Sequence, residues 1–119
     1  MSLLKTINTK NLSDGRQSRI SDDRRLEGDP LLTTWEQDTY NGRVNTGVFQ
    51  AEPGKNISRK GTNYEFCYIL EGVVEITEDG KDAVIYRAGD SFVMKPGFVG
   101  TWRTIETMKK IYVTMNQSG

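Results

Sequence analysis

Residues 63–72 read NYEFCYILEG, and this stretch decides the fold that we expect. Bulky apolar residues dominate it, as is typical of a β-strand. Side chains alternate along a strand, so Glu65 shares one face with Cys67 and Ile69. Both faces are largely apolar, which predicts the protein interior on one side and a covering layer, either the amino-terminal arm or a second subunit, on the other. An ionisable Glu65 in such a strand needs a partner or a purpose.

Turn-forming pairs divide the chain after residue 30 into short strands. These pairs are Asn41-Gly42, Pro53-Gly54, Asp79-Gly80, Gly89-Asp90 and Pro96-Gly97. The predicted strands are residues 31–37, 43–51, 64–70, 73–78, 83–87, 91–95, 99–105 and 109–115. Their spacing of roughly ten residues is typical of an all-β sandwich or barrel. No connecting segment is long enough for a crossover helix, so the strands must pair mostly antiparallel.

The first thirty residues differ from the rest of the chain. They are polar, and their apolar residues are too sparse for a helical stripe. We therefore predict an irregular arm over residues 1–30, packed on the barrel or on a partner subunit, and a β-domain over residues 31–119. A chain of 119 residues is expected to form one domain.

The composition limits the functions that are possible. The chain has 16 basic and 16 acidic residues, a balance that argues against nucleic-acid and anionic-membrane partners. It has no apolar segment approaching the roughly 20 residues of a membrane helix, and no signal peptide is recognisable, so we expect a soluble, cytoplasmic protein. A single cysteine, Cys67, rules out an internal disulfide. The chain has no histidine, the residue on which most transition-metal sites and activated nucleophiles depend, so we expect no cofactor.

Two motifs carry a resemblance to a known family. The block Glu65–Gly72, EFCYILEG, is followed by an Asp-Gly hairpin and then by Ala88-Gly89-Asp90. This series resembles the core of the cupin superfamily, small jelly-roll barrels whose first motif ends in E-x-x-Y-hydrophobic-L-E-G and whose second motif opens with G-D. The resemblance covers roughly residues 26–114. It implies a single-domain cupin jelly-roll β-barrel, also called a double-stranded β-helix, over residues 31–119.

The closer resemblance is to a subgroup, the ureidoglycine-aminohydrolase-type cupin domains, which also includes ethanolamine-utilisation cupins. Its marks are short segments spread along the chain. They are residues 26–30 (LEGDP), 46–49 (TGVF), 53–54 (PG), 97–102 (GFVGTW) and 110–113 (KIYV).

The chain departs from the metal-binding pattern of that superfamily. In metal-binding cupins an H-x-H pair precedes the glutamate that resembles Glu65, and another histidine follows in the second motif. Depending on the gap, the first two slots fall on Ser58 and Lys60, or on Arg59 and Gly61, and the third falls on Gly100. One carboxylate cannot hold a transition metal by itself, so no metal site is expected. Trp102 shares a strand face with Gly100, and we expect its ring to replace the metal, with Gly100 leaving room for it.

Glu65 is the best candidate for a catalytic residue, and two interpretations of it stay open. In the first, burial raises its pKa and makes it a general acid or base, or an anchor for a ligand amine or amide. In the second, it is paired with Lys60, Arg59 or a backbone amide and holds the preceding loop. Cys67 lies in mid-strand with no histidine to activate it, which favours a buried apolar role over a nucleophile.

The candidate ligand-binding residues include Lys110 and Tyr112, which share a face of the last predicted strand and fit either a pocket or a strand edge. Trp102 offers contact area and one N–H donor, and it can both pack the core and stack on a ligand. The full set is Glu65, Trp102, Gln50, Arg59, Lys60, Lys110 and Tyr112.

Three hypotheses of function remain. The first is a metal-free cupin that binds a small polar metabolite in the barrel. The second is a hydrolase or isomerase acting on a ureido or amino compound, related to (S)-ureidoglycine aminohydrolase, whose metal-dependent activity does not transfer simply to a chain without the ligands. The third is a structural or interaction protein whose dimer surface is the functional part. We expect a homodimer in all three cases, because both faces of the 63–72 strand are apolar.

Overall fold

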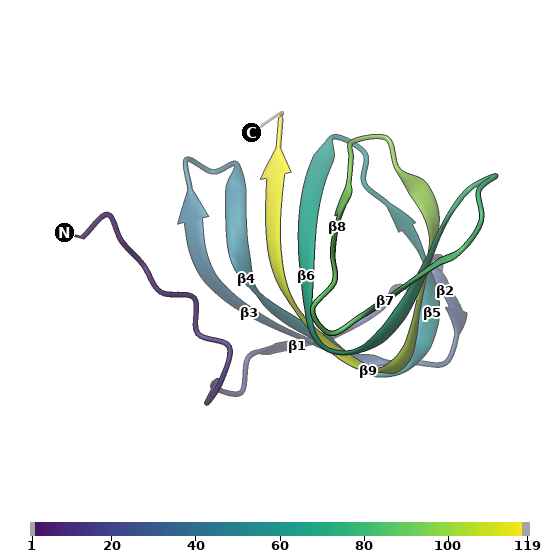
Figure 1. The fold of residues 1–119 in the computed structure, drawn as a ribbon, viewed down its shortest axis with the longest axis horizontal. Coiled ribbons are helices and arrows are strands. Elements are labelled where there is room, and N and C mark those ends of the chain that lie inside the picture. Colours follow the sequence, from purple (N-terminus) through teal and green to yellow (C-terminus); the bar gives the residue numbers. More distant parts are fainter. Residues whose placement is uncertain (1, 118–119) are drawn as a thin grey trace.

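A computed structural model describes residues 2–117 of the chain (Figure 1). This part contains nine β-strands and no helix, and therefore no helix that could cross a membrane. The strands are β1 (Arg16–Arg19), β2 (Arg25–Glu27), β3 (Leu31–Tyr40), β4 (Val44–Ala51), β5 (Gly54–Arg59), β6 (Asn63–Glu78), β7 (Val84–Arg87), β8 (Ser91–Met94) and β9 (Val99–Asn116). The predicted all-β, single-domain fold is confirmed.

Two long strands, β6 and β9, organise the molecule. They pair with each other antiparallel from Asn63 opposite Asn116 to Glu78 opposite Gly100. The first half of β6 also pairs with β8 and its second half with β7, while β9 pairs first with β5 and then with β4. The sheet therefore curls around an interior, as Figure 1 shows, and is consistent with a cupin jelly roll.

The long strands correct the predicted boundaries. Residues 64–70 and 73–78 were expected to be separate strands, but both lie in β6, which changes register between Ile69 and Val74. Gly72 lies in this irregular stretch with φ at +87°, and a Cβ there would overlap the carbonyl oxygen of Thr107. The expected gap is thus a bulged bend where two backbones touch. The predicted strands 99–105 and 109–115 likewise merge into β9.

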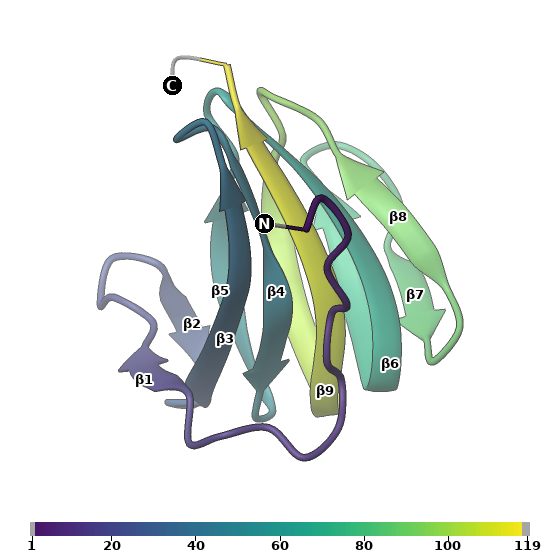
Figure 2. The ribbon, with the colours of Figure 1, turned by 90° about the vertical axis from the view of Figure 1, so that its left-hand side faces the viewer.

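The amino-terminal segment is more regular than the irregular arm that the sequence predicts. Its strands β1 and β2 pair with the edges of β3 and β5. Edge strands carry unpaired backbone groups, which explains why an extended polar segment adds strands there. Figure 2 shows the segment before β1 passing in front of β9 and β4. This segment hydrogen-bonds to β3, where the Trp35 indole donates to the Ser13 carbonyl at 2.7 Å.

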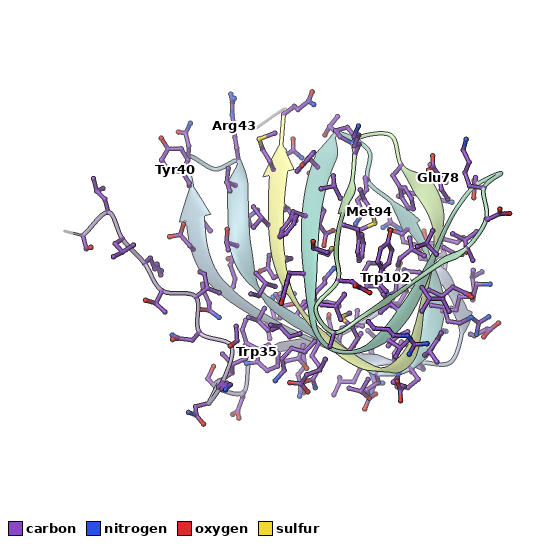
Figure 3. The ribbon with its side chains drawn as sticks, in the orientation of Figure 1. Trp35, Tyr40, Arg43, Glu78, Met94 and Trp102 are labelled. Atoms are coloured by element: carbon purple, nitrogen blue, oxygen red, sulfur yellow. The ribbon has the colours of Figure 1, made fainter. Side chains whose placement is uncertain are left out.

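The core lies inside the curled sheet and follows the predicted strand faces. Cys67 and Ile69 are completely buried, as the alternation of the 63–72 strand predicts. Met94 and Trp102 point into the same interior (Figure 3). The Trp102 ring lies 5.8 Å from the ring of Phe92.

Candidate functional site

A cavity of about 280 Å³ lies inside the curled sheet, between β3, β4, β5 and β9. Phe49 of β4 and Trp102 of β9 form an aromatic wall, and Ser58 of β5 adds a polar group. Ile20 and Pro30 of the amino-terminal segment also line the cavity. Charged side chains are present as well, and three of them form one cluster with Glu65 at its centre.

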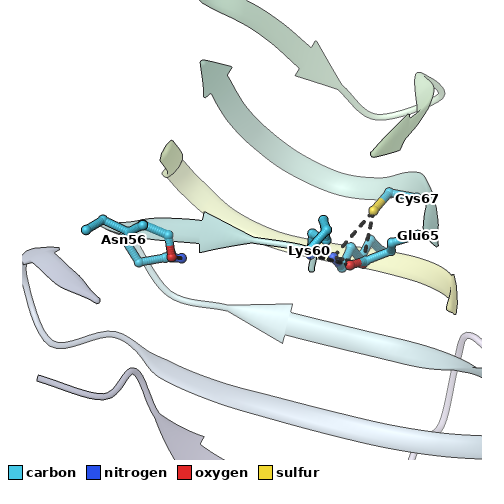
Figure 4. Close-up of polar contacts among 6 residues, drawn as sticks. Asn56, Lys60, Glu65 and Cys67 are labelled. Carbon is cyan, nitrogen blue, oxygen red and sulfur yellow. Dashed lines mark hydrogen bonds and ion pairs between the residues drawn. The ribbon is translucent and has the colours of Figure 1, made fainter. Parts of the chain in front are cut away.

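The carboxylate of Glu65 is held by three donors (Figure 4). Lys60 Nζ lies 2.7 Å from Oε1, and Lys110 Nζ lies 2.6 Å from Oε2. The Cys67 thiol donates to Oε2 at 3.2 Å. Each carboxylate oxygen therefore accepts a hydrogen bond from an ammonium group, and Oε2 also accepts one from the thiol.

Local structure explains how these donors meet. The amide of Asn63 donates to the carbonyl oxygen of Lys60 at 2.8 Å, closing a turn that brings Lys60 next to the start of β6. Lys110 belongs to β9, where it pairs with Ile69 on the same inward face as Glu65. Its long flexible stem lets the ammonium reach the carboxylate from there.

The cluster reverses the expected pKa shift of Glu65. Burial alone would raise this pKa, as the sequence suggested, but the positive charges of Lys110 and Lys60 outweigh burial and hold the pKa well below its usual range. The raised pKa of the first interpretation is therefore wrong, and the structure agrees with the second, in which Glu65 is paired with Lys60. A carboxylate of such low basicity, with both oxygens bonded, is poorly suited to act as a general acid or base.

Lys110 is a buried cation that the surrounding groups keep charged. Burial by itself lowers the pKa of Lys110. The negative charge that Cys67 gains at alkaline pH and the negative charge of Glu65 outweigh burial, so the pKa of Lys110 is raised. Its Nζ also lies 4.4 Å from the ring centre of Trp102 and 5.1 Å from that of Phe49. Such contacts stabilise a desolvated ammonium through the negative faces of the rings.

Cys67 is unreactive in this setting. Burial raises the pKa of its thiol to about 12, although the nearby Lys110 opposes the shift. The thiolate is the nucleophilic form, and little of it forms near neutral pH. This geometry supports the apolar, structural role that the sequence favours.

The lowered pKa of Glu65 predicts an acid-dependent loss of stability. A carboxyl group whose pKa falls on folding stabilises the protein fully above its unfolded value, here 4.5, and loses that contribution as the pH falls toward the folded value. We expect the difference in unfolding free energy between the wild type and Glu65→Gln to stay constant from pH 7 to about pH 5.5 and to narrow below that. Urea denaturation at a series of pH values measures it. A difference independent of pH down to about pH 3 would contradict the charged pairing.

The residues of the site do not fit a transition metal. Ser58 and Lys60 line the cavity while Arg59 is exposed, so the first two histidine slots of the cupin pattern correspond to a hydroxyl and an ammonium group. Within residues 2–117 no group of three or more His, Cys, Asp or Glu side chains could hold a metal ion. Two ammonium groups on the oxygens of Glu65 would also repel a cation.

Gly100, in the third slot, has another role than the sequence suggested. A Cβ there would overlap the carbonyl oxygen of Thr77 on the neighbouring strand β6. The glycine thus permits close backbone packing, and the expectation that it leaves room for Trp102 is wrong. The positive charge next to the Trp102 ring is the ammonium group of Lys110, which belongs to the cluster around Glu65.

Trp102 both packs the core and forms a cavity wall. Only 7% of it is exposed, and its indole N–H donates to the Thr104 hydroxyl at 3.1 Å. Its neighbour Phe92 lines a second cavity, which does not include Trp102. The Trp102 and Phe92 rings therefore stand between two cavities.

The structure brings most of the sequence-predicted residues together, but not all. Glu65, Lys60, Trp102, Lys110 and Tyr112 line the one cavity. Gln50 and Arg59 do not: Gln50 lies between two cavity-lining neighbours on β4 and so faces outward, and Arg59 is exposed. Sequence reasoning did not name the other lining residues. Asn56 and Ser58 lie on β5, a strand that was not predicted, and the predicted packing of the amino-terminal arm did not show which of its residues reach the cavity. The lining residues missed include Ile20, Pro30, Phe49, Asn56, Ser58 and Thr104.

Comparisons with known proteins agree with the fold. Residues 39–112 match the EutQ-like cupin domain family. A search of curated proteins finds no match. Among solved structures, the chain is similar to the EutQ protein of Clostridium difficile, with 19% identity, a TM-score of 0.66 and coverage of 86% of this chain and 83% of that one.

Two further structures are similar. A DUF861-family protein of unknown function from Pseudomonas syringae has 17% identity and a TM-score of 0.78, over 92% of this chain but 46% of that one. A DUF861-family protein from Thermotoga maritima is 31% identical with a TM-score of 0.51, over 55% of this chain and 73% of that one.

Proposed function

This chain belongs to the EutQ-like cupin domain family, and we propose that it binds a small polar metabolite in its barrel cavity without a metal. The observation that carries the proposal is the cavity itself. Aromatic rings wall it, Phe49 and Trp102 among them, and a fixed ionic cluster around Glu65 supplies charge. Largely apolar pockets with a few convergent polar groups are typical small-molecule sites.

A hydrolase or isomerase related to (S)-ureidoglycine aminohydrolase is the alternative in the enzyme class. It would need a proton-transferring group in the cavity. Glu65, the best candidate from sequence, has a lowered pKa and bonds on both oxygens. The geometry therefore favours binding over proton transfer at Glu65. Membership of the ureidoglycine-aminohydrolase-type subgroup stays part of this alternative.

We also propose that a second copy of the chain covers the outer face of β6, β8 and β9. Tyr68, Val93 and Met115 on this face are 38%, 39% and 41% exposed. Phe66 pairs with Val113 between them, and the outward residues of this patch, within 64–68 of β6, 91–93 of β8 and 111–115 of β9, are uncharged. The Glu71–Lys109 ion pair borders the patch. An uncharged patch can meet its own copy across a two-fold axis without like-charge repulsion. Light scattering should give twice the mass of the chain, and Tyr68→Lys should yield monomers; a monomeric wild type would contradict the proposal.

A cytoplasmic location completes the proposal. Cys67 is the only cysteine of the chain, and its thiol is buried and bonded to Glu65. Free thiols of this kind suit a reducing compartment, where disulfides rarely persist.

The binding proposal is tested by a thermal-shift screen of small amines, ureides, carboxylic acids and sugar acids. A ligand that binds only the folded state raises the melting temperature. We expect at least one hit whose affinity falls about tenfold in Trp102→Phe, which loses aromatic wall area in the cavity.

The matched control is Trp35→Phe, the same substitution at a ring that contacts the amino-terminal segment outside the cavity. This variant should keep the affinity of the wild type. Failure of every compound to stabilise the protein, or equal losses in the two variants, would contradict binding in this cavity.

A further inference from the structure

The cavity contains polar groups with hydrogen-bonding capacity that the protein does not use. Ser58 is only 8% exposed, yet its hydroxyl makes no hydrogen bond to any residue in the described part of the chain. Lys60 donates to Glu65 alone within residues 2–117, although an ammonium group has three N–H donors. No fully buried side-chain polar atom lacks a partner in the described residues, so both groups are reached from the cavity, and their unused donors indicate a place for a bound molecule.

The charges at this place do not balance. Lys60 and Lys110 contribute two positive charges, and Glu65 contributes one negative charge. The other acidic residue that lines the cavity is Glu52, which is exposed and whose carboxylate accepts from the Leu31 amide. The cluster therefore has one surplus positive charge in surroundings where water screens charge weakly.

Glu65 has little capacity left for a ligand. Its oxygens already accept from Lys60, Lys110 and the Cys67 thiol. An amine or ammonium ligand would compete with these donors and add a third positive charge to the cluster. A ligand that brings a negative charge would instead find free N–H and O–H donors on Lys60 and Ser58.

We propose that the cavity selects a small organic monocarboxylate, whose carboxylate binds Lys60 and Ser58 and whose apolar part lies against Trp102 and Phe49. This inference rests on the proposed binding function and names its ligand class. One carboxylate matches the single surplus charge of the cluster. The size also agrees, because a buried apolar cavity of about 150 Å³ is enough for benzene, and this one has about 280 Å³.

Three probes that share a ring and differ in head group test the charge directly: benzoate, benzamide and benzylamine. Isothermal titration calorimetry on the wild type should show benzoate binding at least tenfold more tightly than benzamide, and benzylamine most weakly. This comparison needs no variant and therefore no assumption about folding. The benzoate affinity should also fall as salt is added, because screening weakens the charge attraction.

Two variants locate the head group. Lys60→Met keeps the stem and removes the ammonium, so the benzoate affinity should fall about tenfold toward that of benzamide. Ser58→Ala should weaken benzoate several-fold without a charge change. Lys95→Met is the matched control, because Lys95 is exposed and lines the other cavity. It should leave all three affinities unchanged.

The failures of the two proposals are distinguishable. If benzamide or benzylamine binds more tightly than benzoate, and Trp102→Phe weakens that binding, the cavity binds ligands but the carboxylate inference is wrong. Benzoate binding that Lys60→Met leaves intact would equally overturn the inference. If no probe binds and the wider screen finds no stabilising compound, both proposals fail.

Discussion

Replacing Lys110 with methionine is expected to lower the free energy of unfolding by about 2–4 kcal/mol at pH 7. Methionine keeps most of the apolar stem and removes the ammonium group. Glu65 then loses its 2.6 Å partner on Oε2 while it remains 7% exposed. Lys60 still pairs with Oε1, so the loss is that of a buried charge-assisted hydrogen bond on Oε2 together with the contacts of the ammonium with the Trp102 and Phe49 rings. Urea denaturation followed by circular dichroism measures it.

The neighbouring residue offers a matched control. Lys109 lies on the other face of β9, where its Nζ is 3.5 Å from a Glu71 carboxylate whose side chain is 67% exposed. Exposed ion pairs contribute about 0–1 kcal/mol, so Lys109→Met should cost no more than that. Equal losses in Lys109→Met and Lys110→Met would show that the buried cluster does not stabilise the fold in the way its geometry indicates.

A double variant separates the lost charge from the lost contacts. The double variant Glu65→Gln with Lys110→Met removes both the carboxylate and the Lys110 ammonium. Of the charged groups in the cluster, only the Lys60 ammonium is left. We expect the double variant to be less destabilised than the sum of the two single variants, as is usual for residues in one network. Additive losses would mean that Glu65 and Lys110 act independently despite their contact.

Strand alternation predicted the core of the fold because it is a local property. The inward positions of Glu65 and Cys67 follow from the parity of one strand, and both are buried as expected. Strand continuity is a tertiary property. The Glu71-Gly72 pair looks like a turn in sequence, yet in the structure it is a bulge within β6, held against the backbone of β9. The polar β5 was missed because its six residues have no apolar alternation, and pairing with β9 and β2 makes it a strand.

The site was predicted in part for the same reason. Lys60 is five residues from Glu65, so sequence proximity was enough to name it as a partner. Lys110 is 45 residues away, and parity could place it on an inward face without showing which group it would meet. The sign of the Glu65 pKa shift depended on this contact. Burial by itself raises the pKa, and only two ammonium groups at hydrogen-bonding distance reverse that effect.

The glycine at position 100 yields the second large effect, because a side chain there has no room. We expect Gly100→Ala to lower the free energy of unfolding by about 3 kcal/mol or more. Its Cβ would overlap the carbonyl oxygen of Thr77, a backbone atom of the adjacent β6, which cannot turn away as a side chain can. Relief would require β6 and β9 to separate where Glu78 pairs with Gly100.

Gly89→Ala is the control for this experiment, because it adds the same methyl group where no atom lies within 4 Å. Its φ of +95° still disfavours alanine, so it should cost about 1–2 kcal/mol. A larger loss in Gly100→Ala would isolate the steric overlap, whereas equal losses would contradict it.

The overlap at position 100 also bears on metal binding, because a histidine in this third slot of the cupin pattern would begin with the same Cβ. Restoring imidazoles at Ser58 and Lys60 would therefore leave the third slot closed, and we expect such a variant to gain no metal site of the cupin type.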